Sequence, residues 1–200
     1  MLRLFCYVLL LYTATLYGLH AKEVSQKEET KQQLTKNIVG TAKKWTILRA
    51  DPNSNNVCYA ILYVDDRKGN QKIEEETPYI MVHYFSEGRM RFSSYSGYDL
   101  LQDRPVHMSI DSIQYKMNVI NSYAMADSAL QDEKIIEHLK TAQNVLIRGE
   151  GKNYSYSIDY YSPNGFAEAF KIMQSNCSSN INNSSFETIV PQKKHLKKIT

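Results

Sequence analysis

Cysteine is the residue type whose number and spacing in this chain say most about its chemistry. The sequence has three cysteines among 200 residues. Cys6 lies in an apolar N-terminal stretch, whereas Cys58 and Cys177 lie near the two ends of the central region. If that stretch is removed on export, an even pair remains, and an oxidising compartment would join it in one disulfide. We therefore predict a Cys58–Cys177 disulfide, which indicates where the protein works but not which reaction it performs.

The other side chains capable of catalysis form no recognisable motif. Of five histidines, only His83 and His107 fall on predicted strands, and Ser93, Ser94 and Ser96 have no evident His or Asp partner. No glycine-rich phosphate loop, nucleophile elbow, HExxH or paired-cysteine zinc motif occurs. We predict no catalytic residue, no metal site, no cofactor and no enzymatic activity. The alternative is a hydrolase of the cell envelope, in which a strand histidine would meet a serine and a carboxylate in one cleft.

Tyrosines are abundant, with 15 in the chain. Tyr154, Tyr156 and Tyr160 alternate along one predicted strand and therefore share a face, with Tyr161 on the other. An exposed aromatic stripe can bind carbohydrate, peptide or single-stranded nucleic acid. Rings at this spacing also fill the core and edges of a β sandwich, and we favour that interpretation.

These residues need a scaffold, and most of the central region indicates strands. Runs rich in β-branched and aromatic residues, or alternating between apolar and polar residues, occur at 45–48, 57–64, 79–85, 89–95, 106–110, 114–119, 145–148 and 154–160. Asp111-Ser112 joins 106–110 to 114–119 as a predicted hairpin, and residues 149–153 join the last two runs.

Two segments have the spacing of amphipathic helices. The first carries Ile135, Ile136 and Leu139, and Asp127 or Ser128 would cap it. The second would be capped by Ser162, with Pro163 in its first turn. Its apolar stripe consists of Phe166, Ala169, Phe170, Met173 and Cys177. The predicted fold is mainly β with two helices: an antiparallel β sandwich or barrel-like sheet, with a disulfide from a helix end to a strand.

The chain divides into four predicted regions. Residues 1–21 resemble a signal peptide, because Arg3 precedes an apolar run to Leu19 that is too short to span a bilayer. Cleavage is expected after Ala21, and an uncleaved anchor is the alternative. Residues 22–38 form a polar, flexible linker, 39–177 the folded domain and 178–200 a disordered lysine-rich tail.

The charge distribution points away from nucleic acid. The formal net charge is only +3, and the surplus comes from the lysines at 193–198. The central region is close to neutral, so it lacks the broad basic surface of a nucleic-acid-binding protein. The tail could instead be weakly attracted to an anionic membrane, and its simplest role is to keep the chain soluble.

The order of these features resembles that of one family of exported bacterial proteins. A Trp-Thr-Ile strand at 45–47 is followed by Cys58-Tyr59-Ala60 and a Pro-Tyr-Ile-Met-Val strand at 78–82. A Ser-Gly-Tyr at 96–98 and a Val-Leu-Ile-Arg-Gly strand at 145–149 follow, and then a Tyr-Ser-Pro-Asn-Gly-Phe segment at 161–166 and the closing Cys177. From about Lys44 to Cys177 the chain resembles the invasion-associated locus B (IalB) family.

This resemblance implies a small protein of the periplasm or cell surface of an α-proteobacterium. Some members of the family are associated with entry into, or survival in, host cells. The resemblance supplies no catalytic residues, and it implies that Cys58 and Cys177 are a structural pair and that Trp45 and Phe166 are core positions. It predicts a non-enzymatic protein that binds an envelope or host-surface component. The identity of the partner and the oligomeric state stay open.

Overall fold

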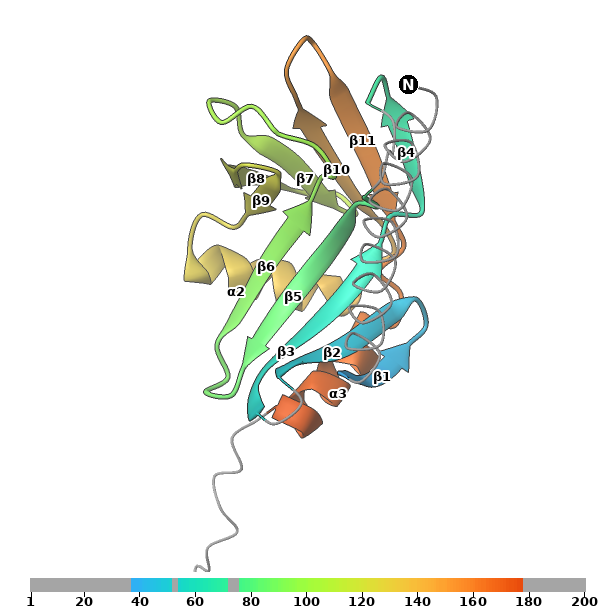
Figure 1. The fold of residues 1–200 in the computed structure, drawn as a ribbon. Helices are drawn as coiled ribbons and strands as arrows, with labels where there is room; N and C mark the ends of the chain where they lie inside the picture. The colour runs from blue at the N-terminus through green and yellow to red at the C-terminus, as the bar shows by residue number, and fades with distance from the viewer. Residues whose placement is uncertain (1–36, 52–53, 72–75, 178–200) are drawn as a thin grey trace, which may run out of the picture.

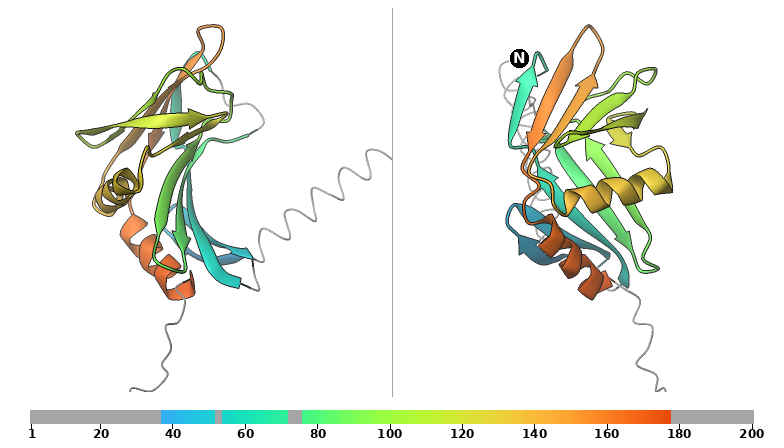
Figure 2. Two further views of the ribbon diagram at one scale, coloured as in Figure 1. Left: turned by 90° about the vertical axis from the view of Figure 1, so that its left-hand side faces the viewer. Right: turned by 180° about the vertical axis from the view of Figure 1, so that it is seen from behind.

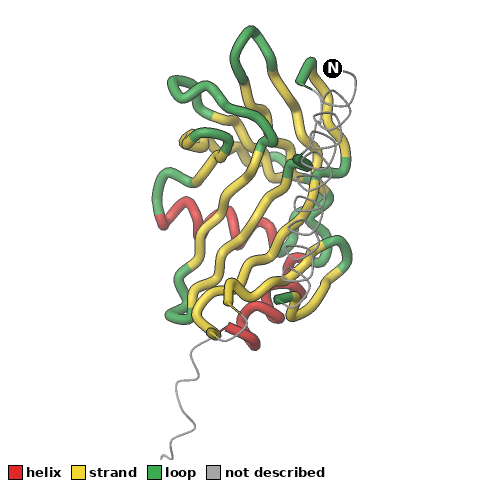
Figure 3. Tube along the Cα trace, in the orientation of Figure 1, coloured by secondary structure: helices red, strands yellow, loops and turns green. Residues whose placement is uncertain are grey.

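The computed structural model describes residues 37–51, 54–71 and 76–177. The predicted signal peptide at 1–21, almost all of the predicted linker at 22–38 and the predicted tail at 178–200 lie outside the described residues. The elements, shown in Figures 1 and 3, are β1 (Ile38–Ala42), β2 (Trp45–Asp51), β3 (Ser54–Tyr63), β4 (Asp66–Gly69), β5 (Tyr79–Phe85), β6 (Met90–Tyr95), β7 (Val106–Ile110), β8 (Ile113–Ile120), β9 (Tyr123–Met125), α2 (Ala129–Leu139), β10 (Val145–Glu150), β11 (Tyr156–Tyr161) and α3 (Phe166–Cys177).

The strands form one antiparallel sheet in the order β1-β2-β3-β5-β6-β9-β8-β7-β10-β11-β4, and the sheet does not close. It divides at β8, because the first residues of β8 pair with β7 and its last three pair with β9. We call β1-β2-β3-β5-β6-β9 the first half-sheet and β7-β10-β11-β4 the second. The chain passes directly from one to the other after β3, where Asp65 N donates to Tyr160 O (2.9 Å).

Both helices lie on one side of the first half-sheet. Helix α3 packs on β1, β2, β3 and β5, and α2 packs on β6 and β7. The view from behind in Figure 2 shows the two helices in front of the strands, whereas Figure 1 looks onto the opposite face. We call the helix-covered side the inner face and the opposite side the outer face.

Alternation along the strands separates these two faces. In β5, Ile80, Val82 and Tyr84 are buried, and the residues between them are only half-buried. The resemblance-based core positions are confirmed: Trp45 and Phe166 are almost fully buried, with ring centroids 4.9 Å apart. The apolar stripes predicted for both helices are also buried. The hydrophobic core therefore lies between the inner face of the sheet and the helices.

The predicted fold class is confirmed, and so is the Ser128 cap of α2, whose side chain accepts from Gln131 N. The Ser162 cap of the last helix was wrong, because α3 begins at Phe166. Ser162 N instead donates to Asp65 Oδ2 (2.6 Å). Gly165, at φ 95°, lies in the left-handed region and immediately precedes the first helical residue. Strands β1, β4 and β9 were not predicted.

Candidate binding face

The two cysteines are joined as predicted. Cys58 lies in β3 and Cys177 is the last residue of α3, and their disulfide has a Cα–Cα distance of 5.8 Å. Both residues are fully buried. The bond ties the end of α3 to the inner face of the sheet, and this gives it a structural role.

The candidate catalytic residues are brought together only in part. His83 Nε2 lies 3.4 Å from Ser93 Oγ across the β5–β6 pair. Burial lowers the pKa of His83, and the positive charge of Arg91 lowers it further. Within residues 37–51, 54–71 and 76–177, no hydrogen bond or ion pair joins His83 to a carboxylate. His107 is on β7, exposed and in the other half-sheet.

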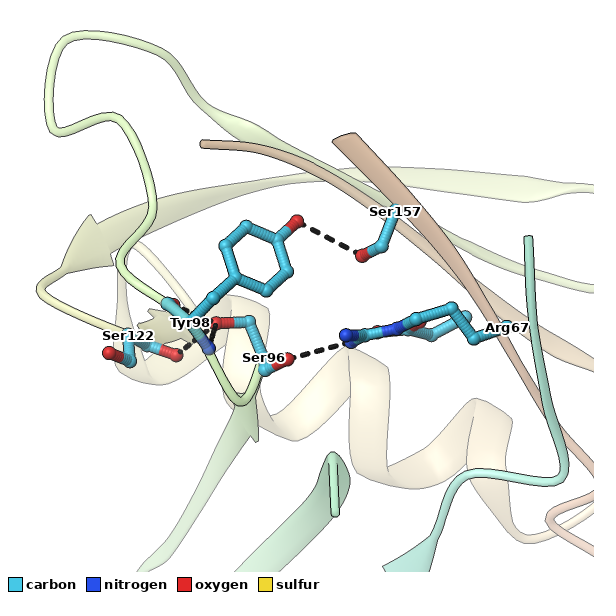
Figure 4. Close-up of polar contacts among 6 residues, drawn as sticks. Arg67, Ser96, Tyr98, Ser122 and Ser157 are labelled. Atoms are coloured by element: carbon cyan, nitrogen blue, oxygen red, sulfur yellow. Dashed lines mark hydrogen bonds and ion pairs between the residues drawn. The ribbon is translucent and has the colours of Figure 1, made fainter. Parts of the chain in front are cut away.

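A buried polar cluster connects the two half-sheets and is drawn in Figure 4. Arg67 of β4 makes a bidentate ion pair with Asp159 of β11: Nε lies 2.5 Å from Oδ1 and Nη2 lies 2.7 Å from Oδ2. Arg67 Nη2 also donates to Ser96 O (2.7 Å), just after β6. The Tyr98 hydroxyl lies 3.0 Å from Ser157 Oγ, and the Tyr98 ring packs against the Arg67 guanidinium.

Burial dominates the electrostatics of this cluster. The side chains of Arg67 and Asp159 are each only 4% exposed. Burial raises the pKa of Asp159, and the hydrogen bonds and charge of Arg67 oppose that rise. Burial likewise raises the pKa of Tyr98 and of Tyr161. A buried arginine with a bidentate carboxylate partner is satisfied by the fold and needs no ligand.

The cavity beside the cluster is too small for a substrate. Its volume is about 10 Å³, and its lining includes Ser96, Tyr98, Ser157 and Asp159. This is about the space that one water molecule needs. The cluster therefore acts as a polar joint between β4, β11 and the segment after β6.

The most unusual surface lies on the outer face of the first half-sheet. Four tyrosines from four strands stand opposite one another in register, and we call them the tyrosine row: Tyr63 of β3, Tyr79 of β5, Tyr95 of β6 and Tyr123 of β9. Neighbouring ring centroids are 6.0, 5.1 and 5.0 Å apart along this order. Tyr63 is 49% exposed and Tyr123 36%, while the two central rings are half-buried.

Further apolar and aromatic residues continue this surface along the strands. The next row has Ile61, Met81, Ser93 and Met125 in register, and the row beyond it has Tyr59, His83 and Arg91. Phe85 follows at the end of β5, with Arg89 over its ring. We call this whole outward surface, from the tyrosine row to Phe85, the tyrosine face.

The second half-sheet shows what an ordinary solvated face looks like in this protein. Its outward residues include Asp66, Lys68, His107, Arg148 and Glu150, together with Tyr156 and Tyr160 of β11, all exposed or half-buried. This alternation of buried apolar and exposed charged residues is typical of a sheet with one face in water. The tyrosine face departs from that pattern, because most of its outward positions are tyrosine, phenylalanine, methionine or isoleucine, with Ser93, His83 and Arg91 as the polar exceptions. A contiguous, partly exposed surface of this kind is a candidate interaction site.

The tyrosine face has a hydroxyl pair in the tyrosine row and two arginines, Arg89 and Arg91, beside Phe85 and His83. The hydroxyls of Tyr79 and Tyr123 lie 3.3 Å apart. Burial and this contact raise the pKa of Tyr79, so its hydroxyl stays protonated and can donate. Arg91 is exposed and belongs to none of the ion pairs found among the described residues. The face can therefore offer apolar contact, phenolic hydrogen bonds and the cation of Arg91.

The tyrosine stripe suggested by the sequence is arranged differently. Tyr156 and Tyr160 lie outward on β11 and Tyr161 inward, as the alternation predicted. Arg148 lies over the Tyr156 ring and Lys68 over the Tyr160 ring. Tyr154 lies in the preceding turn. The tyrosine row was missed because its members are far apart in sequence, and only the strand register brings them together.

The described part of the chain has neither a cluster of metal-binding side chains nor a membrane-spanning helix. No group of three or more His, Cys, Asp or Glu side chains there is arranged to hold a metal ion. No helix of residues 37–51, 54–71 and 76–177 is long and apolar enough to cross a membrane.

The fold and the disulfide define a domain built on one open antiparallel sheet, with α2 and α3 on its inner face. No protein-family model and no curated protein matches the sequence. Among solved structures, invasion associated protein B from Bartonella henselae is similar, with a TM-score of 0.50 and 11% sequence identity. The match covers 68% of this chain and 95% of that chain. The two proteins share a fold, and this supports the resemblance drawn from the order of the sequence motifs.

Proposed function

We propose that this protein is a member of the invasion-associated locus B family: an exported, non-enzymatic protein of the periplasm or cell surface. We further propose that it acts by binding a protein of the bacterial envelope or host surface through the tyrosine face. The observation that carries this proposal is the tyrosine row, with Tyr63 and Tyr123 exposed and Tyr79 and Tyr95 half-buried, on the side of the sheet opposite α2 and α3.

The composition of the face favours a protein partner. The cores of protein interfaces are enriched in tyrosine, phenylalanine, methionine and arginine and depleted in lysine and acidic residues. Tyr79, Met81, Phe85 and Arg91 are outward residues of this kind on two adjacent strands. Their strand positions are fixed by the sheet, so little ordering cost would accompany binding. Neighbouring rings of the tyrosine row contact one another, either stacked, tilted or edge to face. The ring edges and hydroxyl groups are therefore the parts of the row that a partner would contact.

The disulfide supports export. Structural disulfides persist outside the reducing cytosol, and the Cys58–Cys177 bond is fully buried. The predicted signal peptide at residues 1–21 would direct the chain to the secretion machinery.

The double variant Tyr79→Ser with Tyr95→Ser tests the role of the face. The mature wild-type protein, the double variant and a control, Tyr160→Ser, would be immobilised and exposed to envelope and host-membrane extracts. We expect a discrete protein to be retained by the wild type and the control, and retained at least tenfold less by the double variant. Circular dichroism would check that all three fold. Equal retention by all three would overturn the proposed face.

One contact favours a second function, the envelope hydrolase. His83 Nε2 is 3.4 Å from Ser93 Oγ. In a hydrolase, the serine of such a pair would be the nucleophile and the histidine its general base. Ser93, however, is buried at 3% exposure beneath the outward side chains, so a substrate could not approach its hydroxyl without a rearrangement. Hydrolysis of an envelope substrate by the wild type, abolished by Ser93→Ala, would establish the hydrolase in place of the binding protein.

A further inference from the structure

The turn between β10 and β11 has an unusual residue at its tip. Ser155 N donates to Lys152 O (3.1 Å), and the two central residues, Asn153 and Tyr154, have φ values of 56° and 58°. Two consecutive left-handed residues define a type I′ turn, in which Asn-Gly is the preferred central pair. This chain has tyrosine where glycine is preferred. Figure 1 shows the β10–β11 hairpin projecting beyond the neighbouring strands.

The tyrosine at this tip does not serve the fold. A bulky side chain in the left-handed region is strained, and such strain persists where function requires it. The Tyr154 side chain is also 98% exposed, so burial of the ring does not offset the strain. Tyr154 thus departs from the residue preference of its turn, and its side chain makes no contact among the described residues that would offset the strain. A departure of this kind points to a functional role.

Three hydrogen bonds hold the turn in place. The Asn70 side chain donates to Tyr154 O (3.0 Å) and accepts from Tyr156 N (2.7 Å). Gly151 N donates to Ser155 O (2.8 Å). The backbone of Tyr154 is therefore held in place before any ligand arrives, which lowers the part of the entropy cost of binding that comes from ordering the turn.

A cleft lies beside this turn. Its volume is about 440 Å³, within the usual range for small-ligand sites. The lining comes from the β10–β11 hairpin and from the segment after β6, and it includes Arg104, Arg148, Lys152, Asn153, Tyr154 and Tyr156. The cleft is open to solvent along the hairpin tip.

Positive charge exceeds negative charge in the cleft. Arg104 and Arg148 share one carboxylate, that of Glu150, at 2.7 and 3.6 Å. Lys152 is exposed and takes part in none of the ion pairs of the described residues. Three cations therefore face one anion, and the surplus would attract a negatively charged ligand.

We propose that this cleft binds an anionic saccharide, with the Tyr154 ring packing against a sugar ring and Lys152, Arg104 and Arg148 pairing with its carboxylate or sulfate groups. A flat, exposed tyrosine suits the apolar face of a sugar, and Asn153 and Ser155 supply neutral hydrogen-bonding groups. A simple anion would need the cations but not the ring. This site is separate from the tyrosine face and does not depend on the function proposed for that face.

The test is titration of the mature full chain with a sulfated heparin hexasaccharide, an uncharged maltohexaose and inorganic sulfate, measured by calorimetry. We expect the sulfated hexasaccharide to bind with clearly greater affinity than either of the other two. Tyr154→Gly should weaken this binding at least tenfold. The same variant should raise the unfolding temperature, because glycine is unstrained at this position. The two opposite effects distinguish a binding residue from a structural one.

The lysine-rich tail needs a matched control, because it could bind a sulfated glycan by charge alone. A variant with Lys193, Lys194, Lys197 and Lys198 changed to serine should keep the Tyr154-dependent binding. Tyr160→Ser, in the strand that follows the turn, should leave the affinity within about twofold. Three results would each overturn the proposal: binding abolished by the tail variant, unchanged affinity in Tyr154→Gly, or inorganic sulfate binding as tightly as the hexasaccharide.

Discussion

The buried Arg67–Asp159 pair shows how single residues hold the two half-sheets together. The pair joins β4 to β11, and Arg67 adds a hydrogen bond to the backbone at Ser96. Removal of one partner of such a pair leaves an uncompensated buried charge. We expect Arg67→Met to lower the free energy of unfolding at pH 7 by about 3–5 kcal/mol, measured by urea denaturation.

The same variant should show a distinctive pH dependence. Burial raises the pKa of Asp159 above 3.8, and Arg67 opposes this rise in the wild type. Without Arg67, the folded state binds a proton more readily than the unfolded state. The loss of stability should therefore be smallest near pH 4, grow as the pH rises from 3.8 through the raised pKa, and be complete above it.

A double variant provides the control for this prediction. Arg67→Met with Asp159→Leu removes both charges and should recover most of the lost stability. Between pH 4 and pH 7 its urea midpoint relative to the wild type should change much less than that of Arg67→Met, because the variant has no carboxyl at position 159 to titrate. If Arg67→Met alone were as stable as the wild type at pH 7, the pair would have no role in joining the half-sheets.

At the scale of elements, the sequence predicted the strands that have a recognisable pattern of apolar residues. It missed the short strands β1, β4 and β9, which are strands because they pair with a neighbouring strand. The run at 106–110 was found because its apolar and polar residues alternate, and the run at 79–85 because it is rich in β-branched and aromatic residues. Strand β4 has the sequence Asp-Arg-Lys-Gly, which resembles a loop, and it becomes a strand by pairing with β11. Its buried Arg67 is satisfied by Asp159, 92 positions away, and by the backbone oxygen of Ser96, and no local pattern reveals these pairings.

The tyrosine face was missed for a related reason. Each of its tyrosines lies singly in or at the end of an apolar strand, where a ring is expected to fill the core. Only the register Tyr63–Tyr79–Tyr95–Tyr123 shows that all four point to the same uncovered side. The disulfide, by contrast, could be predicted, because few cysteines leave few alternatives.

The start of α2 offers an element-scale prediction. Ser128 Oγ accepts from Gln131 N, and Gln131 Oε1 accepts from Asp127 N, an arrangement close to a capping box. Ser128→Ala should lower the free energy of unfolding by about 1 kcal/mol, measured by thermal or urea unfolding. Ser175→Ala, at an exposed site in α3, is the matched control and should stay within about 0.5 kcal/mol of the wild type. Equal effects of the two changes would contradict the cap.

The disulfide is an element-scale device as well, since it fastens α3 to β3 across a sequence separation of 119 residues. On the loop-entropy model its loss costs about 4–5 kcal/mol. We expect Cys58→Ser to lose stability of this order and to form dimers through Cys177, seen on non-reducing gels. Cys58→Ser with Cys177→Ser should be equally unstable but monomeric under the same conditions. Two free thiols in the mature exported protein, measured by mass spectrometry, would disprove the bond.

At the scale of the whole molecule, the two half-sheets present different surfaces to their surroundings. The first exposes tyrosine, methionine and phenylalanine, and the second exposes charged residues along its strands and a basic cleft at its hairpin tip. A surface divided in this way could engage a protein and an anionic glycan at the same time, because the two sites lie on separate parts of the sheet. A chain that joins two weak sites gains affinity through effective concentration.

The lysine-rich segment at 178–200 lies outside the described residues, and its attraction to an anionic membrane stays a prediction from the sequence. Each lysine near such a membrane contributes about 1 kcal/mol, and the attraction weakens as salt shortens the Debye length. Vesicles containing anionic phosphatidylserine should therefore retain the full chain at low salt and release it as salt rises through the physiological range, measured by co-sedimentation. Replacing Lys193, Lys194, Lys197 and Lys198 with serine should abolish the retention. Retention that does not change with salt, or that is equal for the full chain and the four-lysine variant, would contradict a membrane role for the tail. The tail differs from the near-neutral central region in its charge, and attraction by charge must weaken as salt rises.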